Sequence, residues 1–411
     1  MNRAAGQGIL DCFDTRHRIS QRPIECDRDR EQFLRGTRIF SGSNCYSHWA
    51  IFEYMKSNAI ILTGGYLDTN QAKTAHGLIR GSDRFTIKAI IDPKSASRDA
   101  GEVLDGKPRN IPVLKSLRDY FESGNGDAAY CIVGVATKGG IIPASLRAEL
   151  KEALQGGLGL VNGLHEHIAD IPELADLAKE KGLEIIDVRK PRKVKDLHFW
   201  TGRIAEVRCP KIAILGTDCA LGKRTTTKIL TDLMKSEGYS AEMIYTGQTG
   251  WMQGASYGFI FDSTLNDFVS GELEHAVVSC YHDRKPDIIF IEGQSALCNP
   301  SGPAGAEWIV SAAASGVILQ HDPARKQYKD YEFYPAFIPS LDDTIKMIKM
   351  YGAPTLGITV NTSKMSPEDA RQWCVTASQK LGIPAMLPFD ESIAELIPVF
   401  KRMITQSKSE A

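Results

Sequence analysis

The segment that most constrains this 411-residue chain lies in its second half, where an apolar run passes through a glycine-rich turn into a helical pattern. The apolar run is Lys211–Leu215 (KIAIL), the turn is Gly216–Gly222 (GTDCALG), and the helical pattern covers Lys223–Ser236. A buried strand, a glycine turn and a helix in this order form the loop that cradles phosphate groups in P-loop proteins. The segment therefore predicts an α/β sheet with a phosphate site at its edge.

The residue types of the turn suit an anion. Gly216 and Gly222 allow the backbone to turn so that successive N–H groups point inward. The helix that begins at Lys223 adds the partial positive charge of its first turn, and the lysine ammonium adds a full charge. The expected phosphate-binding residues are Gly216, Thr217, Cys219, Ala220, Leu221, Gly222, Lys223, Arg224, Thr225 and Thr226.

The turn departs from the common pattern in two ways. Five residues instead of four separate Gly216 from Gly222, a spacing that resembles the dethiobiotin-synthetase-like branch of P-loop proteins. Arg224 stands where a Ser or Thr hydroxyl normally binds Mg²⁺, and a guanidinium has no lone pair to offer a metal. Either Thr225 is re-aimed toward a metal, or the site works without one and Arg224 neutralises the phosphate directly.

Apolar runs alternate with helical patterns over most of the chain, which predicts two doubly wound parallel sheets. The first half has strand candidates at 59–63, 85–91, 128–135, 158–162 and 184–188, and helix candidates at 71–80, 114–123, 145–154 and 171–181. The second half has strand candidates at 211–215, 241–245, 287–291, 316–320, 355–360 and 384–387. Its helix candidates are 223–236, 264–280, 303–314, 340–350, 366–380 and 391–404.

These patterns divide the chain into three parts. Residues 1–45 are charged and lack periodicity, so they are interpreted as an amino-terminal extension. A Rossmann-like domain is expected at 46–192 and a P-loop domain at 205–411, and the basic stretch Arg189–Lys195 is interpreted as the linker between them.

Two further segments follow predicted strands, so they belong to the edge where ligands bind in open α/β sheets. Tyr245–Gly254 (YTGQTGWMQG) offers backbone amides, side-chain donors and an indole ring against which an adenine or acyl chain can lie. The expected substrate-binding residues are Gly247, Gln248, Thr249, Gly250, Trp251, Gln294 and Arg325.

Glu292 ends the apolar run of the segment DIIFIEGQ and should project from the carboxyl edge of the sheet. Such a carboxylate holds Mg²⁺ through water in metal-dependent nucleotide hydrolases, serves as a general base in a transfer to an amine, or simply orients Lys223. Asp218 and Lys223 are the other candidate catalytic groups: Asp218 as a second base, and Lys223 as the group that polarises a carbonyl.

The composition excludes several classes of protein. Forty-nine basic residues balance fifty acidic ones, so no global field attracts nucleic acid or an anionic membrane. The nine cysteines form no CxxC pair, and no metal site is predicted. The first twenty residues lack an apolar signal region and no apolar run has membrane length, so we expect a cytoplasmic protein. We also expect a homo-oligomer, because doubly wound enzymes of this size often self-associate.

The segments GTDCALGKRTTT, YTGQTGW, NDFVSGELE and IEGQSAL together resemble a bacterial and archaeal family long known only as a domain of unknown function. Its members have a Rossmann-like amino-terminal half and a P-loop carboxy-terminal half, and the resemblance covers residues 55–405. It implies an N-acetyltransferase that uses acetyl-CoA as donor and a D-amino acid, D-glutamate first among them, as acceptor.

The residues themselves leave two alternatives open. One is an ATP- and Mg²⁺-dependent ligase or kinase of the dethiobiotin-synthetase type, because the same loop binds ATP. The other is a non-catalytic nucleotide sensor that binds a ligand and converts nothing. The pyrophosphate and ribose phosphate of coenzyme A suit the loop equally well, and Arg224 favours a ligand that needs no metal.

Overall fold

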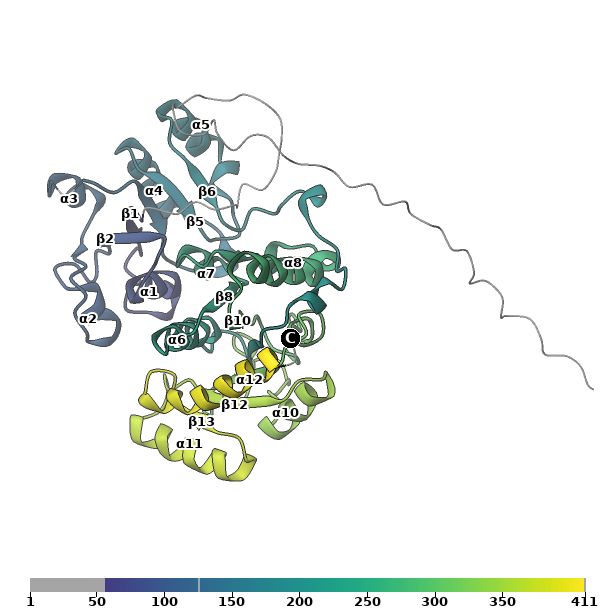
Figure 1. Cartoon of the computed structure of the whole chain (residues 1–411). Coiled ribbons are helices and arrows are strands. Elements are labelled where there is room, and N and C mark those ends of the chain that lie inside the picture. The colour runs from purple at the N-terminus through teal and green to yellow at the C-terminus, as the bar shows by residue number, and fades with distance from the viewer. Residues whose placement is uncertain (1–55, 125, 410–411) are drawn as a thin grey trace, which may run out of the picture. The chain divides into compact units, whose positions relative to one another are not determined.

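The computed structural model describes residues 56–124 and 126–409, and the predicted extension at 1–45 lies outside them. The described chain forms two sheets, the first drawn in purple to blue and the second in teal to yellow (Figure 1). Every strand pairing in both sheets is parallel, and helices alternate with the strands. The predicted fold class is therefore confirmed.

The first sheet has six strands in the order β3-β2-β1-β4-β5-β6. Its strands are β1 (Ser57–Leu62), β2 (Phe85–Ile91), β3 (Val113–Leu114), β4 (Tyr130–Val133), β5 (Gly159–Asn162) and β6 (Ile185–Asp187). Its helices are α1 (Lys73–Arg80), α2 (Ala100–Asp105), α3 (Leu117–Glu122), α4 (Ala144–Gln155) and α5 (Pro172–Lys181). The strand order reverses between β1 and β4, and ligands bind at such a switch point in doubly wound sheets.

The second sheet has seven strands in the order β13-β12-β11-β7-β10-β8-β9. Its strands are β7 (Lys211–Gly216), β8 (Ala241–Tyr245), β9 (Tyr257–Gly258), β10 (Ile288–Glu292), β11 (Gly316–His321), β12 (Thr355–Val360) and β13 (Ala385–Met386). Its helices are α6 (Lys223–Ser236), α7 (Gln248–Met252), α8 (Asn266–Arg284), α9 (Ala306–Val310), α10 (Leu341–Met350), α11 (Pro367–Leu381) and α12 (Ile397–Ser409). The strand β7, which leads into the glycine turn, is central and pairs with β10 and β11.

Two kinds of element differ from the prediction. The strands β3 and β9 have two residues each, too few to produce an apolar run in the sequence. The helices α2 and α7 were not predicted either, and α7 lies inside the segment Tyr245–Gly254. Gly247 has an extended backbone (φ −139°) and is the N-cap residue of α7, which begins at the next residue.

Successive side chains of the central strands point to opposite faces of the second sheet, and each face has its own apolar core. Ile212 and Ile214 of β7 pack with residues of α6 and α12, whereas Ala213 and Leu215 pack with residues of α8 and α9. Helices on both faces require strands that are apolar throughout, which explains why β7 reads as a continuous apolar run.

The two halves also share a core. Trp251 and Met252 of α7 belong to the same apolar cluster as Ile61 of β1 and Leu78 of α1. Hydrogen bonds accompany this packing, because Gln253 Nε2 donates to the carbonyl of Gly77 at 2.8 Å. The helix α7 therefore joins the P-loop half to the Rossmann-like half.

Two buried carboxylates of α8 hold the segment that connects the halves. Glu274, which is 3% exposed, accepts hydrogen bonds from the Thr201 N–H, the Thr201 hydroxyl and the Ile204 N–H at 2.6 to 3.0 Å. Glu272 accepts from His198 N–H and from Arg192 in the same segment. The connecting segment is therefore bound along α8 and is not a free linker.

We expect Glu274→Ala to destabilise the fold, because the buried N–H of Ile204 and the partly buried donors of Thr201 then lose their acceptor. Leaving buried donors unsatisfied costs about 1–3 kcal/mol in the free energy of unfolding. The midpoint of urea unfolding, followed by circular dichroism, measures the effect. Glu180→Ala on the exposed face of α5 is the control. Equal midpoints for the two variants would contradict the role of Glu274.

Candidate active site

The glycine turn folds into a cradle at the carboxyl end of β7. Ala220 and Gly222 both have positive φ values, 53° and 105°, which reverse the chain direction before α6 begins at Lys223. No described residue accepts a hydrogen bond from the N–H groups of Ala220, Leu221 or Gly222. Three successive donors beside the first turn of a 14-residue helix form a place for an anion.

The Lys223 side chain lies under this cradle. Its ammonium donates to the carbonyls of Asp218 at 2.8 Å and Ser295 at 2.7 Å. Burial lowers the pKa of Lys223 to about 8, and the charges of Cys219, Asp218 and Glu292 partly oppose this shift. The group is therefore mostly protonated at pH 7 and keeps its positive charge beside the turn.

Asp218 holds the glycine turn in place through hydrogen bonds. Its fully buried carboxylate accepts hydrogen bonds from the N–H of Cys219 (2.6 Å), from Asn299 (3.2 Å), from Arg325 (2.8 Å) and from the N–H of Lys329 (2.9 Å). A carboxylate with four donors has little capacity left for a substrate proton. The structure thus gives Asp218 the task of holding the turn, in place of the second base predicted from the sequence.

Arg325 belongs to the same anchor. Its guanidinium donates to Asp218 and to the carbonyl of Cys219 at 2.7 Å, and it lies 3.4 Å from Asp322. The side chain is only 13% exposed. These contacts commit Arg325 to the turn, so the structure does not present it to a substrate carboxylate as the sequence had suggested.

Arg224 faces away from the cradle. Its guanidinium bonds to the side chain of Gln253 and donates to the Thr225 hydroxyl at 3.2 Å, next to Gly77 of α1. The hydroxyl of Thr226 donates to Gln320 at 2.6 Å. Thr217 completes the turn through a 3.0 Å hydrogen bond with the ring of His321.

Glu292 is the last residue of β10 and is buried. Its carboxylate accepts from the N–H of Thr246 at 3.0 Å, and a Cβ atom on Gly250 would come within 3.0 Å of it. Burial raises the pKa of Glu292 to about 7, although the Thr246 N–H, Arg224 and Lys223 pull it down. A carboxyl group whose pKa lies near neutrality can accept and return a proton at physiological pH.

The predicted substrate segment is mostly buried at the junction of the two halves. The ring of Trp251 is covered by the Arg84 guanidinium at 4.1 Å and is 4% exposed, so it does not provide the expected stacking surface. Thr249 packs against Gly77, and Gln294 donates to the Thr246 hydroxyl at 3.0 Å. Gln248 is the residue of this segment that faces a cavity.

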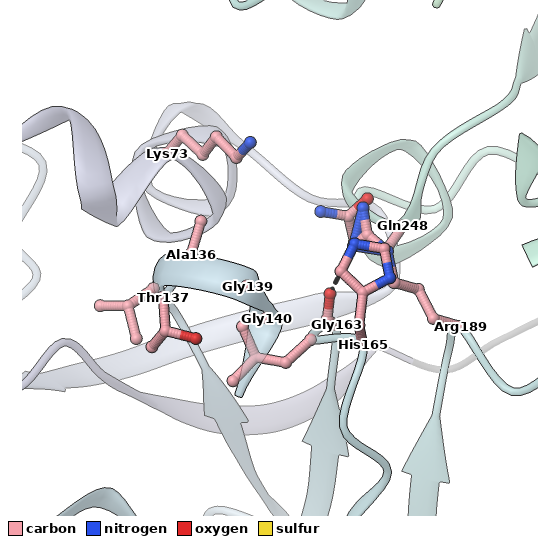
Figure 2. A pocket seen from close by; sticks show the side chains of 11 residues that line it. Lys73, Ala136, Thr137, Gly139, Gly140, Gly163, His165, Arg189 and Gln248 are labelled. Carbon is pink, nitrogen blue, oxygen red and sulfur yellow. Dashed lines mark hydrogen bonds between the residues drawn. The ribbon is translucent and has the colours of Figure 1, made fainter. Parts of the chain in front are cut away.

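That cavity lies at the switch point of the first sheet and has a volume of about 310 Å³. Its lining comes from the segments that follow β4, β5 and β6, from the start of α1 and from α7 (Figure 2). The lining residues are Lys73, Val135, Ala136, Thr137, Gly139, Gly140, Gly163, Leu164, His165, Arg189 and Gln248.

The cavity is positively charged. Arg189 donates to the carbonyl of Gly163 at 2.6 Å and pairs with Asp262 at 2.7 Å. Lys73 reaches in from α1 toward Gln248 (Figure 2). Burial lowers the pKa of Lys73, and the nearby Arg189 charge lowers it further. The sequence had given no sign of this cavity, because Arg189 reads as part of a basic linker and Lys73 as an ordinary helical residue.

A parallel sheet with a phosphate cradle, joined to a Rossmann-like sheet with its own cavity, defines a two-domain α/β protein of the P-loop class. The chain belongs to the DUF1611 family: residues 198–397 match its P-loop domain and residues 93–191 match its Rossmann-like domain, each described as a domain of unknown function. The predicted family is thus confirmed.

Three relatives show how far the similarity extends. Proteins named D-glutamate N-acetyltransferase from Pseudoalteromonas sp. and Tritonibacter scottomollicae are 25% and 27% identical to this chain over 272 and 273 residues. Each match covers 65% of this chain and 79% of the relative. The crystal structure of a DUF1611 family protein from Anabaena variabilis superposes with a TM-score of 0.74 at 27% identity, covering 87% of this chain and all of that one.

The described residues contain neither a membrane-spanning helix nor a metal-binding cluster. None of their helices is long and apolar enough to span a bilayer. They also contain no cluster of three or more His, Cys, Asp or Glu side chains arranged to hold a metal ion.

We expect the turn to bind the phosphate groups of coenzyme A, the ligand predicted from the sequence, and Lys223→Ala to weaken this binding at least about tenfold, because hydrogen bonds from a charged donor contribute about 1.5–3 kcal/mol. Isothermal titration calorimetry gives the dissociation constant. The matched control is Lys228→Ala, on the exposed face of the same helix, where the lysine pairs only with Asp232. Unchanged affinity in a folded Lys223→Ala protein would contradict the phosphate site.

Proposed function

We propose that this protein transfers the acetyl group of acetyl-CoA to the amine of a D-amino acid, with D-glutamate as the first candidate. Two relatives at 25% and 27% identity bear the name of this activity. The structural observation that carries the proposal is Glu292, a buried carboxyl group with a pKa of about 7 beside a phosphate cradle.

The cradle suits the donor. The pyrophosphate of acetyl-CoA accepts hydrogen bonds from the N–H groups of Ala220, Leu221 and Gly222, and Lys223 supplies the neutralising charge. The first turn of α6 adds its dipole. These groups bind phosphate oxygens without a metal ion between them.

Glu292 supplies the base. An amino acid arrives as an ammonium ion, which has no lone pair and cannot attack a carbonyl carbon. Glu292 accepts the proton from the ammonium group, either directly or through one water molecule. The raised pKa makes the carboxylate basic enough for this task.

The transfer then balances in its atoms and charges. The amine nitrogen forms a bond to the thioester carbon and loses a second proton, the C–S bond breaks, and the thiolate of coenzyme A leaves and takes up that proton. The proton that Glu292 accepted from the ammonium group returns to solvent. The negative charge that develops on the carbonyl oxygen needs donors, and Lys223 and the N–H groups of Gln248 and Thr249 are candidates. Both reactants are held against one another, which converts a bimolecular step into an intramolecular one.

The activity is tested by incubating the protein with acetyl-CoA or Mg-ATP and a panel of D- and L-amino acids. Release of free thiol with D-glutamate supports the proposal. Release of ADP would instead indicate the ligase or kinase alternative, and binding without any product would indicate a sensor.

We expect the turnover number to rise with pH through about 7 and to level off above it. Glu292 must be ionised to accept a proton, and it is ionised only above its pKa. Glu292→Gln should lower the turnover number about 10²- to 10⁴-fold and remove this inflection. The measurement is thiol release at saturating donor between pH 5.5 and 9.

Glu242→Gln on the neighbouring strand β8 provides the control for this substitution. It should leave both the rate and the pH profile unchanged. Full turnover by Glu292→Gln, or an unchanged inflection near pH 7, would exclude Glu292 as the base.

A further inference from the structure

The cavity of the Rossmann-like half has no part in the chemistry described above, although it is built as a binding site. It lies at the switch point between β1 and β4, and its volume of about 310 Å³ is at the small end of the range for ligand sites. A molecule the size of an amino acid fits such a space, whereas a whole coenzyme A does not.

Two polar side chains point into the cavity without partners among the described residues. The amide of Gln248 makes no hydrogen bond, although the residue is only 8% exposed. The ammonium of Lys73 makes neither a hydrogen bond nor an ion pair. Buried polar groups are nearly always hydrogen-bonded, so the unpaired amide of Gln248 indicates a polar ligand, and the exposed ammonium of Lys73 at the rim of the cavity adds a positive charge to the site.

The charge of the cavity defines the ligand further. Its lining contains no aspartate or glutamate. Lys73 and Arg189 contribute two positive charges, and Asp262, bound to Arg189, offsets one of them. Burial lowers the pKa of His165, so this ring is neutral at pH 7. One positive charge remains, which matches an acidic amino acid, since two carboxylates and one ammonium leave it a net charge of −1.

One residue of the cavity lining is next in the chain to a residue that packs against the candidate base. Gln248 follows Gly247, and a Cβ atom on Gly247 would lie 3.5 Å from Glu292 Oε1. A ligand that contacts Gln248 in the cavity therefore lies close to the segment that packs against the candidate base.

We propose that this cavity is the acceptor site, and that Lys73 and Gln248 make it select an amino acid with a carboxylate side chain. The proposal rests on the proposed transferase function and adds the origin of its specificity. Lys73 neutralises a carboxylate of the acceptor, Gln248 donates a hydrogen bond to it, and Arg189 is held in place by Asp262 as a fixed part of the wall.

The experiment compares D-glutamate with D-glutamine, which has the same shape and lacks the side-chain charge. The full-length protein should have a higher kcat/KM for D-glutamate than for D-glutamine. In Lys73→Met the ratio of these two kcat/KM values should fall at least tenfold. The KM for D-glutamate should rise at least tenfold, whereas the KM for acetyl-CoA should change less than twofold. Lys73→Arg should restore part of the preference, since it restores the charge.

Lys115→Met, an exposed lysine of the same half, is the control and should behave like the unmodified protein. A preference that survives in Lys73→Met would overturn the proposal. A rise in the KM for acetyl-CoA alone would also overturn it, because the cavity would then belong to the donor.

A measurement of ligand binding tests the acceptor cavity independently of the transferase activity. Calorimetric titration with D-glutamate and D-glutamine needs no turnover. Binding of D-glutamate that Lys73→Met abolishes would support the acceptor cavity even if no thiol is ever released. Absence of D-glutamate binding to the unmodified protein, in the presence and absence of coenzyme A, would reject the cavity whatever the activity.

Discussion

The docking of α7 against α1 is the contact on which both sites depend. Gln253 donates to the carbonyls of Gly77 and Gly81, and Arg84 donates to the carbonyl of Trp251 while its guanidinium covers the indole ring. These bonds are made by buried groups whose loss would leave unpaired donors in the junction. They fix the one helical turn that carries Gln248 into the first cavity and places Gly247 and Gly250 against Glu292.

The two candidate sites lie on different sheets on either side of this junction. In the proposed function the second sheet holds phosphate through the turn after β7, and Asp218 fixes that turn by accepting four hydrogen bonds. The first sheet offers a small cationic cavity at its switch point. Because Gln248 of α7 lines that cavity, the proposed acceptor site is built from both halves of the chain.

The sequence predicted the fold well because both sheets are covered on both faces, so their strands are apolar throughout and easy to recognise. It also predicted the strand, glycine turn and helix at 211–236 and the position of Glu292 at a strand end. It could not predict which polar groups pair with one another. Asp218, Arg325 and Trp251 have residue types that suit catalysis or binding, but tertiary contacts occupy them, and such contacts join residues up to 167 positions apart. Lys73 and Arg189 were missed for the same reason, since only the folded chain brings them together.

The unusual residue of the phosphate turn now has a structural explanation. Arg224 replaces the hydroxyl residue of the common pattern, and its guanidinium bonds to Gln253, the residue that ties α7 to α1. A Cβ atom on Gly77 would come within 3.1 Å of this guanidinium, so glycine at that position of α1 leaves room for it. The position after the P-loop lysine thus serves the junction of the two domains here, and its charge lies close enough to Glu292 to lower the pKa of the carboxyl group. The departure from the common pattern therefore couples the donor turn, the candidate base and the domain interface through a single side chain.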